Sequence, residues 1–600
     1  MVASIQARAT YVEEPRSASA LWQSWFTRTG HQTWRRSIEK IYGSDRYIRF
    51  VYLKPTKRQW DHVEVVDGGQ SMHSITKRDF LQLIGVGASA LAAFSLIGSS
   101  AAYSAQLPAW AALPEEAAPK TGGKLVYGQT YPNWAVGTSD NGRHPHFWID
   151  LLTRSIWNCL LWVDHDFNLQ GELAESWGPT DDTLTVWDFK LREGVTFHHG
   201  KEMTSEDAVA SINEHIALKG SSFLNKWFAK VEAQGKYGLR FTLNAPYAEF
   251  PYALAEYRLT IGPAAASGAI LADGIGTGPF KLVQVDNRRG FQAVRNENYW
   301  LKGRPFVDEL EGYVVNSQTA INGFRSGQFN VVFNIDPTTA GQYESSGGLV
   351  HKSKGGDQFL ISLPKNLDLV WNDPRIREAI SLSIDRDAIN TIVYNDPGSW
   401  VGNDTQMSGL NHEFLPREKP YDLERAKQLL AEAGHPNGLD LPTIVFCPSF
   451  PEEPRVMAVV AESLKKAGIN VEIREMPCDG FSAYTVQVNA PFGRPARSLV
   501  GPRNPAINLG RLVTNDSEAA AWTGAKADAF KKLYAETIAE PSAEKRVEMY
   551  RECQRIAQSD TPAIVLGGRR NMLAHAPGVK NIKSHSQNWG SRFDDVWIES

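Results

Sequence analysis

The feature that most constrains the fold is an alternation of apolar strands and capped helices in the second half of the chain. The segments are, in order, a strand at 358–363, helices at 374–394 and 423–433, a strand at 443–447, a helix at 453–467 and a strand at 470–475. Asp373 and Asp422 stand at N-cap positions, and Pro374 occupies the first helical position. Strand–helix–strand order predicts parallel strands with helices packed on the sheet, so we expect an α/β domain here.

The length and composition indicate more than one domain. The chain has 600 residues, of which 42% are hydrophobic, and its mean hydropathy is −0.34. These values are typical of a soluble globular protein with several domains. The formal net charge of −4 argues against a nucleic-acid partner.

A targeting signal is expected at 72–105. The basic pair Lys77-Arg78 precedes an apolar run at 81–97, and small residues follow. This order is typical of a secretory signal, and glycines within the run disfavour a permanent membrane span. Residues 76–81 resemble the twin-arginine motif with Lys77 in place of the first arginine, so both the Sec and the Tat routes stay open. No cysteine ends the apolar run, and we therefore expect a free periplasmic protein without a lipid anchor.

The 71 residues ahead of this signal contain no comparable pattern. An export signal rarely follows so long a lead. We expect Met72 to be the true start and 1–71 to be a non-native or disordered extension. Residues 106–121 are rich in Pro and Ala and are expected to form a flexible tail.

The stretch 187–207 carries the most specific pattern in the chain. It reads WDFKLREGVTFHHGKEMTSED, which predicts an alternating strand, a turn at Gly200 and a helix capped by Thr204 or Ser205. It resembles the signature of the extracytoplasmic solute-binding proteins of the peptide/nickel class, family 5. Further blocks similar to that family's occur in the family's order at 173–177, 276–280, 295–300, 373–386 and 421–438.

The resemblance implies an α/β, two-lobed periplasmic-binding-protein fold of type II with an extra subdomain inserted in the first lobe. The expected limits are lobe I at 122–357 with the insertion at about 166–275, lobe II at 358–560, and a return to lobe I at 561–600. The chain would cross between the lobes near 355–359 and near 560–564.

The resemblance also implies where a solute binds. The loop after the first strand would contribute Tyr131, Asn133 and Trp134. In peptide-binding members an aspartate of lobe II pairs with the α-amino group of the peptide, and Arg503 or Asn504 stands in its place here. A buried cation at that position favours a carboxylate, sulfonate or phosphate over an ammonium. The alternative is that Arg503 is a solvated surface residue.

Four further residues are candidates on general grounds. Trp400 and Trp522 are expected in the wall of the binding cleft, because such walls are largely apolar and aromatic. Cys447 closes the predicted strand 443–447 and Cys478 follows the predicted strand 470–475, and they can form a disulfide in an oxidising compartment if those strands are parallel neighbours. Free buried thiols are the alternative for this pair.

A metal site is not expected. His198 and His199 are adjacent in an extended segment, so their side chains point to opposite faces and cannot easily chelate one ion. The four cysteines match no metal-binding spacing.

These observations predict a solute receptor of an ABC importer. It would capture a peptide or peptide-like small solute, anionic if Arg503 contacts it, and deliver it to an inner-membrane permease and its ATPases. We expect a monomer that needs no cofactor and catalyses no reaction, because the sequence has no GxSxG, HExxH or GxxxxGK[ST] motif. The alternatives are a nickel- or metal-chelate-binding member of the same family and, less favoured, a hydrolase on this scaffold.

Overall fold

The computed structural model describes the chain in segments. They are residues 108, 111, 113, 118–130, 138–139, 144–145, 149–217, 227–257, 259–264, 274–286, 289–363, 369–448, 450–476, 496–500, 503–513, 522–587 and 590–599. The predicted export signal and the 71 residues before it lie outside these segments, so the statements about them stay predictions. In the described part, no helix combines the length and the apolar character needed to span a bilayer.

The first sheet contains seven strands built around β1. Its order is β10 (Phe280–Asp286), β11 (Gly290–Arg295), β12 (Glu309–Val315), β1 (Lys124–Thr130), β13 (Val331–Phe333), β23 (Met572–His575) and β14 (Leu349–Lys352). Strand β1 runs parallel to both β12 and β13. Its alternate residues Leu125 and Tyr127 are buried, and the Tyr127 ring contacts Phe291 and Phe333 at centroid distances of 5.9 and 5.6 Å. The other face of β1 is covered as well, since Val126 packs against a second buried cluster, so both faces of this strand contribute to the core.

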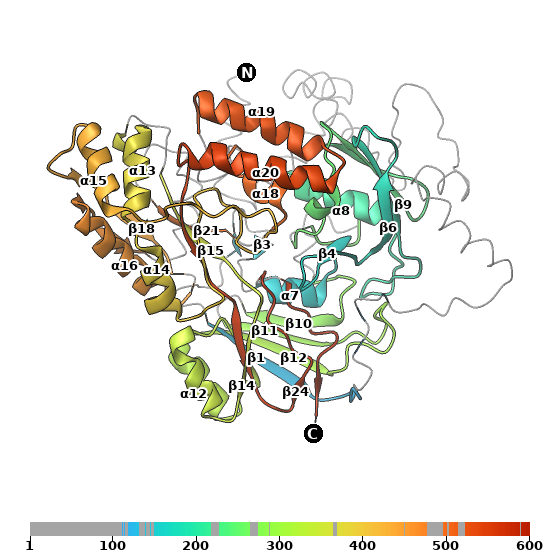
Figure 1. Cartoon of the computed structure of the whole chain (residues 1–600). Coiled ribbons are helices and arrows are strands. Elements are labelled where there is room, and N and C mark those ends of the chain that lie inside the picture. The colour runs from blue at the N-terminus through green and yellow to red at the C-terminus, as the bar shows by residue number, and fades with distance from the viewer. Residues whose placement is uncertain are drawn as a thin grey trace, which may run out of the picture. The chain divides into compact units, whose positions relative to one another are not determined.

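The second sheet contains six strands from the later part of the chain. Its order is β16 (Trp400–Val401), β22 (Ile564–Gly568), β15 (Gln358–Ser362), β21 (Ala496–Val500), β18 (Ile444–Phe446) and β20 (Ile473–Glu475). Strands β18 and β20 are parallel neighbours, as the strand–helix–strand pattern predicted. The helices α13 (Pro374–Ser383), α15 (Leu423–Glu432) and α16 (Glu453–Lys466) lie beside this sheet in Figure 1.

The predicted caps explain where two of these helices begin. The Asp373 carboxylate accepts the backbone N–H of Arg375 at 2.9 Å, and the Asp422 carboxylate accepts that of Arg425 at 2.9 Å. The single helix expected at 374–394 is interrupted, because α13 ends at Ser383 and Ile384 is extended. Asp385 then caps a second start, α14 (Arg386–Ala388), which continues as a π-helical turn, η5 (Ile389–Tyr394).

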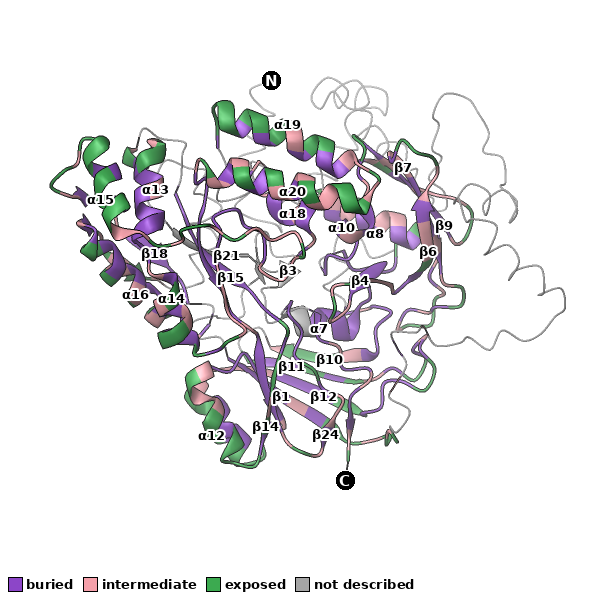
Figure 2. Cartoon of the chain, in the orientation of Figure 1, coloured by how far each residue is buried: buried purple, intermediate pink, exposed green. Residues whose placement is uncertain are grey.

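The inserted subdomain is an antiparallel sheet with its own aromatic core. The order is β6 (Ala174–Pro179), β7 (Val186–Leu191), β9 (Gly238–Leu243) and β8 (Phe228–Ala233), with β4 (Leu161–Val163), β5 (Leu169–Gly171), α8 (Ser205–Ala217) and α10 (Phe250–Ala253) around it. The Phe241 ring lies 5.1 Å from Phe189 and 5.4 Å from Phe250, and all three are fully buried. Buried residues recur along β9 in Figure 2. The specific stretch at 187–207 is therefore a structural element of this subdomain.

Three helices near the end of the chain extend the same core. They are α18 (Pro505–Gly510), α19 (Ala525–Ala539) and α20 (Ala543–Gln558). Buried side chains of these helices, including Leu509 and Phe530, belong to one hydrophobic cluster with Phe241 of the insertion. The backbone N–H of Ala248 also donates to the carbonyl of Ile538 at 2.7 Å. The insertion therefore packs against helices that lie between two strands of the second sheet in the sequence.

The remaining elements are short. They are α7 (Ile149–Ile156), α11 (Ser317–Arg325), η3 (Pro337–Thr339), α12 (Ala340–Glu344), η4 (Val370–Asn372), and the strand pairs β2 (Thr138–Ser139) with β3 (His144–Pro145), β17 (Leu439–Asp440) with β19 (Ile469–Asn470), and β24 (Val579–Lys580) with β25 (Trp597–Ile598).

One expected boundary is wrong. The predicted return to lobe I begins at residue 561. In the structure, however, β22 (564–568) pairs antiparallel with β15 and with β16 in the second sheet. The chain enters the first sheet only with β23, which begins at Met572. An all-apolar strand such as β22 carries no local signal for the sheet that it joins, because its partners are distant in the sequence.

Candidate functional site

Two crossing segments, 353–357 and 569–571, connect the two sheets. The first leads from the end of β14 to the start of β15, and the second leads from the end of β22 to the start of β23. They run side by side, since the N–H of Arg569 donates to the carbonyl of Asp357 at 3.2 Å and that of Asn571 to Gly355 at 3.0 Å. At the side of each sheet where these segments enter or leave it, parallel strands also have their carboxyl ends. Ligands of open α/β sheets bind outside such ends, so the candidate site lies here.

An ion pair links the two sides of this site. Asp336 follows β13 in the first sheet, and its carboxylate oxygens accept from Nη1 and Nη2 of Arg455 in α16 at 3.0 and 2.9 Å. Burial acts to raise the pKa of Asp336, but the hydrogen bonds from Arg455 and Thr338 and the charge of Arg455 together outweigh it, and the net pKa is lowered. The pair therefore stays ionised at neutral pH and holds α16 against the end of β13.

Four residues of the second sheet stand in register at this edge. Gln358 pairs with both Gly568 and Val500, and Trp400 pairs with Gly568. We call Trp400, Gly568, Gln358 and Val500 the edge row. It places the predicted wall residue Trp400 at the site.

Two glycines fix the Trp400 ring. A Cβ atom at Gly568 would lie 1.8 Å from the ring carbon Cζ2, and one at Gly409 would lie 2.4 Å from Cγ. The ring therefore occupies space that only glycine leaves open at both positions. Its indole Nε1 is buried and has no hydrogen-bond acceptor within the described segments.

Buried amide groups lie next to this ring. The Gln358 amide nitrogen donates to the carbonyl of Gln406 at 2.6 Å, while the Gln358 Oε1 has no donor in the described part of the chain. Gln406 is fully buried in a left-handed conformation (φ 62°), and neither its Nε2 nor its Oε1 has a partner among the residues that the structure describes. A buried polar group without a partner costs about 1–3 kcal/mol, so these atoms call for a polar ligand or water.

Arg503 lies just past the end of β21, where the sequence analysis expected a cation. It is neither a solvated residue nor a cation awaiting a solute, because it forms an ion pair with Glu256. The Arg503 Nε donates to Glu256 Oε2 at 3.1 Å, and the two side chains are 10% and 3% exposed. Glu256 follows the inserted subdomain's α10, so the pair connects this subdomain with the second sheet. The expectation that Arg503 selects an anion therefore loses its basis.

Asn504 and Trp522 have structural contacts. The Asn504 side chain caps α18 by accepting the N–H of Ala506 at 2.9 Å, and it donates to Glu249 Oε1 at 3.0 Å. Trp522 is 2% exposed and its indole N–H donates to Asp560. Asp560 precedes β22, at the opposite end of that strand from the edge row. The prediction that Trp522 lines the site is therefore wrong, because core packing explains its burial.

Some of the other predicted residues lie outside the part of the chain that the structure describes. Tyr131, Asn133 and Trp134 lie outside the described residues, although β1 delivers the loop that contains them to the candidate edge. Cys447 is disulfide-bonded, whereas Cys159 and Cys553 are free and buried. Cys478 also lies outside the described residues, so the Cys447–Cys478 pairing stays a prediction, and its premise of parallel strands is met.

The histidine pair behaves as a structural element. His198 Nδ1 accepts the N–H of Gly276 at 3.2 Å, which leaves Nε2 to donate to the carbonyl of Gly278 at 3.1 Å. Burial lowers the pKa of His198, which fits a neutral ring with both nitrogens engaged. Among the described residues, no group of three or more His, Cys, Asp or Glu side chains could hold a metal ion.

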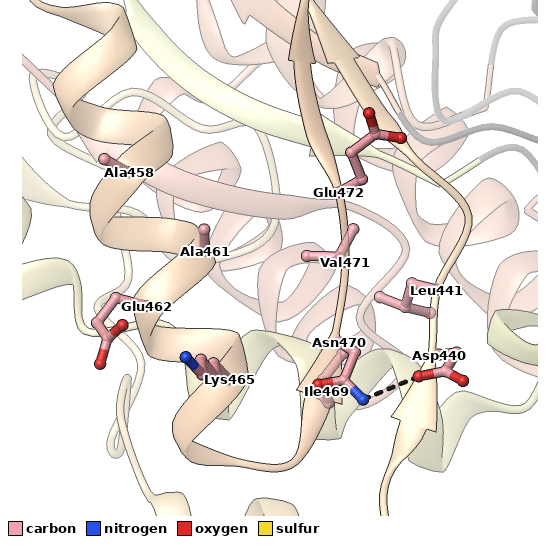
Figure 3. Close-up of a pocket in the computed structure, with 10 residues that line it drawn as sticks. All are labelled: Asp440, Leu441, Ala458, Ala461, Glu462, Lys465, Ile469, Asn470, Val471 and Glu472. Carbon is pink, nitrogen blue, oxygen red and sulfur yellow. Dashed lines mark hydrogen bonds between the residues drawn. The ribbon is translucent and has the colours of Figure 1, made fainter.

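Two surface cavities lie away from this site. The larger one, about 680 Å³, opens between α16 and the segment 469–472, and Figure 3 shows Asn470 bonded to Asp440 beside it. The smaller one, about 260 Å³, is lined by residues of α13 and by 558–561. The larger cavity lies near the amino end of β20 and the smaller one near the amino end of β22. The edge row lies at the other end of the sheet, where β21 and β22 have their carboxyl ends. We therefore assign neither to solute binding.

Sequence reasoning missed Gln358, Gln406 and Glu256. Gln358 carried one usable signal, since it is the polar residue that opens a strand after a crossing. Gln406 and Glu256 carried none, because their roles depend on contacts distant in the sequence, 247 residues in the case of Glu256 and Arg503.

Comparison with known proteins agrees with this architecture. The family profile described as "Bacterial extracellular solute-binding proteins, family 5 Middle" matches residues 168–493, more than half of the chain. The chain is 26% identical over 473 residues to heme-binding protein A of Haemophilus influenzae, covering 70% of this chain and 82% of that protein. It is also 26% identical over 363 residues to the glutathione-binding protein GsiB of Escherichia coli, covering 57% and 69% respectively.

Solved structures show the same fold. The periplasmic binding protein DppA of Helicobacter pylori, in complex with the peptide STSA, superposes with a TM-score of 0.66 at 22% identity over 80% of this chain and 99% of that one. The dipeptide-binding protein of Pseudoalteromonas sp. SM9913, in complex with Met-Leu, gives a TM-score of 0.68 at 17% identity over 80% and 100%. With two sheets, two crossings and a profile match across most of the described residues, this chain belongs to family 5 of the bacterial extracellular solute-binding proteins.

Proposed function

We propose that this chain captures a peptide-like solute at the facing edges of its two lobes and delivers it to an ABC permease. Lobe I is the first sheet with the inserted subdomain, and lobe II is the second sheet with its helices. A solute bound between them contacts both, and therefore stabilises the conformation in which they touch. The family's members are binding proteins, and we propose no reaction for this one.

The observation that carries the peptide-like class is the set of unpaired amide and indole groups in the edge row and at Gln406, which is bonded to Gln358. Gln406 presents an unpaired donor and an unpaired acceptor, Gln358 an unpaired acceptor, and Trp400 an unpaired donor. A peptide group offers one N–H and one C=O, so it complements such a surface, whereas a simple anion would satisfy only the donors. The peptide and glutathione ligands named for relatives belong to this chemical class.

Metal-chelate binding is not favoured as a second function. The His198 ring would have to break two backbone hydrogen bonds before it could ligate an ion.

Export to the periplasm by the Sec or the Tat route, without a lipid anchor, remains part of the proposal, as does a monomeric state. Peptide mapping of the expressed protein before export tests the start at Met72, since peptides from 1–71 would contradict it.

The experiment that tests the solute class is mass spectrometry of small molecules released from freshly purified protein. The compounds found are then titrated back onto stripped protein by calorimetry. We expect compounds with amide groups, and a loss of affinity of tenfold or more in Gln406→Leu. Gln428→Leu is the matched control, because Gln428 lies exposed on α15. Release of only amide-free compounds, or equal affinity in both variants, would contradict the proposal.

A further inference from the structure

Arg569 and Glu452 form a buried ion pair at the candidate site. Arg569 is the first residue after β22, and Glu452 precedes α16 in the turn that follows β18. Their side chains are 1% and 0% exposed. Contact is made between Arg569 Nη1 and Glu452 Oε1, and the Arg569 guanidinium lies over the Phe450 ring at 4.3 Å from its centroid. Both charges therefore stand just beyond the carboxyl ends of second-sheet strands.

Each partner of this pair leaves one side unused. Nε and Nη2 of Arg569 have no acceptor, and Oε2 of Glu452 has no donor, within the segments that the structure describes. The Nε–Nη2 edge of a guanidinium is planar and matches the two oxygens of a carboxylate. The Asp336–Arg455 pair nearby differs, since its carboxylate meets two guanidinium nitrogens.

The surroundings hold the two charges in place. The backbone N–H of Arg569 is bonded to Asp357 O at 3.2 Å, which anchors it to the other crossing segment. The Phe450 ring covers one face of its guanidinium, so only the edges accept partners. Burial acts to lower the pKa of Arg569, but Glu452, Asp357 and Tyr394 together outweigh it, so the net pKa is raised and the guanidinium stays charged.

We infer that Arg569 and Glu452 are the receptor for a zwitterionic α-amino-acid group of the solute. The unused Arg569 edge binds the carboxylate, and the unused Glu452 oxygen accepts from the ammonium. A lone anion would face Glu452 and also the buried Asp357 carboxylate, whose charge acts on Arg569, and a lone cation would face Arg569. The two side chains are in direct contact, so the charges that satisfy them must also lie close together, as they do on a single α-carbon.

This inference rests on the proposed function and narrows it. A linear peptide carries its ammonium and carboxylate at opposite ends, whereas a free amino acid or a γ-linked peptide carries both on one carbon. The inference therefore favours the second group of solutes.

The test is calorimetry on the full, solute-stripped chain with three probes. They are glutathione, whose γ-glutamyl end carries both charges on one carbon, N-acetylglutathione, which lacks the ammonium, and the linear peptide Ala-Ala-Ala. We expect glutathione to bind at least tenfold more tightly than N-acetylglutathione and than Ala-Ala-Ala. The variants Glu452→Gln and Arg569→Gln are expected to lose affinity for glutathione by tenfold or more, and Glu452→Gln is expected to lose the preference for the free amine.

Matched controls separate this site from general charge effects. Arg474→Gln and Glu472→Gln break an exposed ion pair of the same lobe and are expected to bind glutathione as the wild type does. If a site variant fails to fold by circular dichroism, the wild-type comparison of glutathione with N-acetylglutathione decides the matter. Equal affinity for those two probes would overturn the inference.

The failures of the inference and of the proposed function are distinguishable. If the purified protein releases a solute without an α-amino-acid group, or if both site variants bind glutathione normally, the inference is wrong and the solute-binding role stands. If nothing is released and no probe binds, the proposed function itself fails, and the inference fails with it.

Discussion

Asp336 and Arg455 join the first sheet to α16 of the second through two hydrogen bonds of 3.0 and 2.9 Å. Because one partner comes from each lobe, this pair favours the conformation in which the lobes touch. Arg455 is 42% exposed, so solvent screens the pair and its contribution is modest, about 1 kcal/mol.

The first prediction follows from this pair. Asp336→Asn is expected to weaken lobe contact and to raise the solute Kd severalfold, measured by calorimetry together with small-angle scattering. The folded pKa of Asp336 is depressed, so its contribution is present above the unfolded pKa near 4 and is lost as pH falls through the folded value. Unchanged scattering and affinity in Asp336→Asn at pH 7 would contradict the role.

The second prediction concerns Arg503 and Glu256. Removal of either partner breaks a buried ion pair, so Glu256→Gln is expected to destabilise the fold by about 3–5 kcal/mol in urea unfolding. The double variant Arg503→Met/Glu256→Gln is expected to recover most of that loss. The exposed pair Lys427–Glu424 supplies the control, with effects expected below about 1 kcal/mol. A double variant as unstable as the single one would show that the two residues are not coupled.

The third prediction concerns the glycine that supports Trp400. In Gly568→Ala the added methyl group would meet the indole ring at 1.8 Å, so the ring must move. We expect an altered tryptophan emission spectrum and a clear loss of solute affinity. Gly341→Ala is the control, since nothing lies within 4 Å of a Cβ atom there. An unchanged spectrum and affinity would exclude Trp400 from the site.

The fourth prediction concerns acid stability. His585 is buried with both ring nitrogens bonded, and burial lowers its pKa to about 3. Between that value and the unfolded pKa near 6.5, the unfolded chain binds the extra proton, so stability falls as pH falls below about 6.5. Protonation of this residue in the unfolded chain is expected to lower the free energy of unfolding by about 2 kcal/mol between pH 7 and pH 5. Urea unfolding of His585→Gln should show a smaller pH dependence than the wild type, while His199→Gln, at an exposed position, should match the wild type.

The fifth prediction concerns the cysteines. Cys159 and Cys553 are buried, and burial raises the pKa of each thiol to about 12. They are expected to react with a thiol reagent only after denaturation. A peptide map under non-reducing conditions should show Cys447 linked to Cys478. A third reactive thiol in the denatured, unreduced protein would contradict this pairing.

The sequence predicted those parts of the fold that depend on local chemistry. The caps at Asp373 and Asp422 and the parallel pair β18–β20 were read correctly, because each is encoded within a short window. The split of the helix at Ile384 was missed, since a buried apolar residue there looks the same in a continuous helix. The sheet membership of β22 was misjudged because strand pairing is set by distant partners.

The candidate site was predictable to a smaller extent. Trp400 lies in the edge row, and its contact with a solute stays a prediction. The sequence offers Arg503 as a solute contact or a solvated surface residue and does not reveal its ion pair, because Glu256 comes from a different subdomain. The buried amide of Gln406 left no trace in the sequence, since its unpaired state depends on a loop whose shape is set by tertiary contacts.

The shared core between the insertion and α18–α20 has a mechanical consequence. Separating these parts would return buried apolar surface to water at about 25 cal/mol per Å². A rearrangement that releases solute at lower cost keeps Leu509 and Phe530 packed on the insertion and bends the chain elsewhere. The same core also holds Leu360 of β15 and Val565 of β22, so α18–α20 tie the insertion to the second sheet, and a rearrangement that spares this core would move these three parts together.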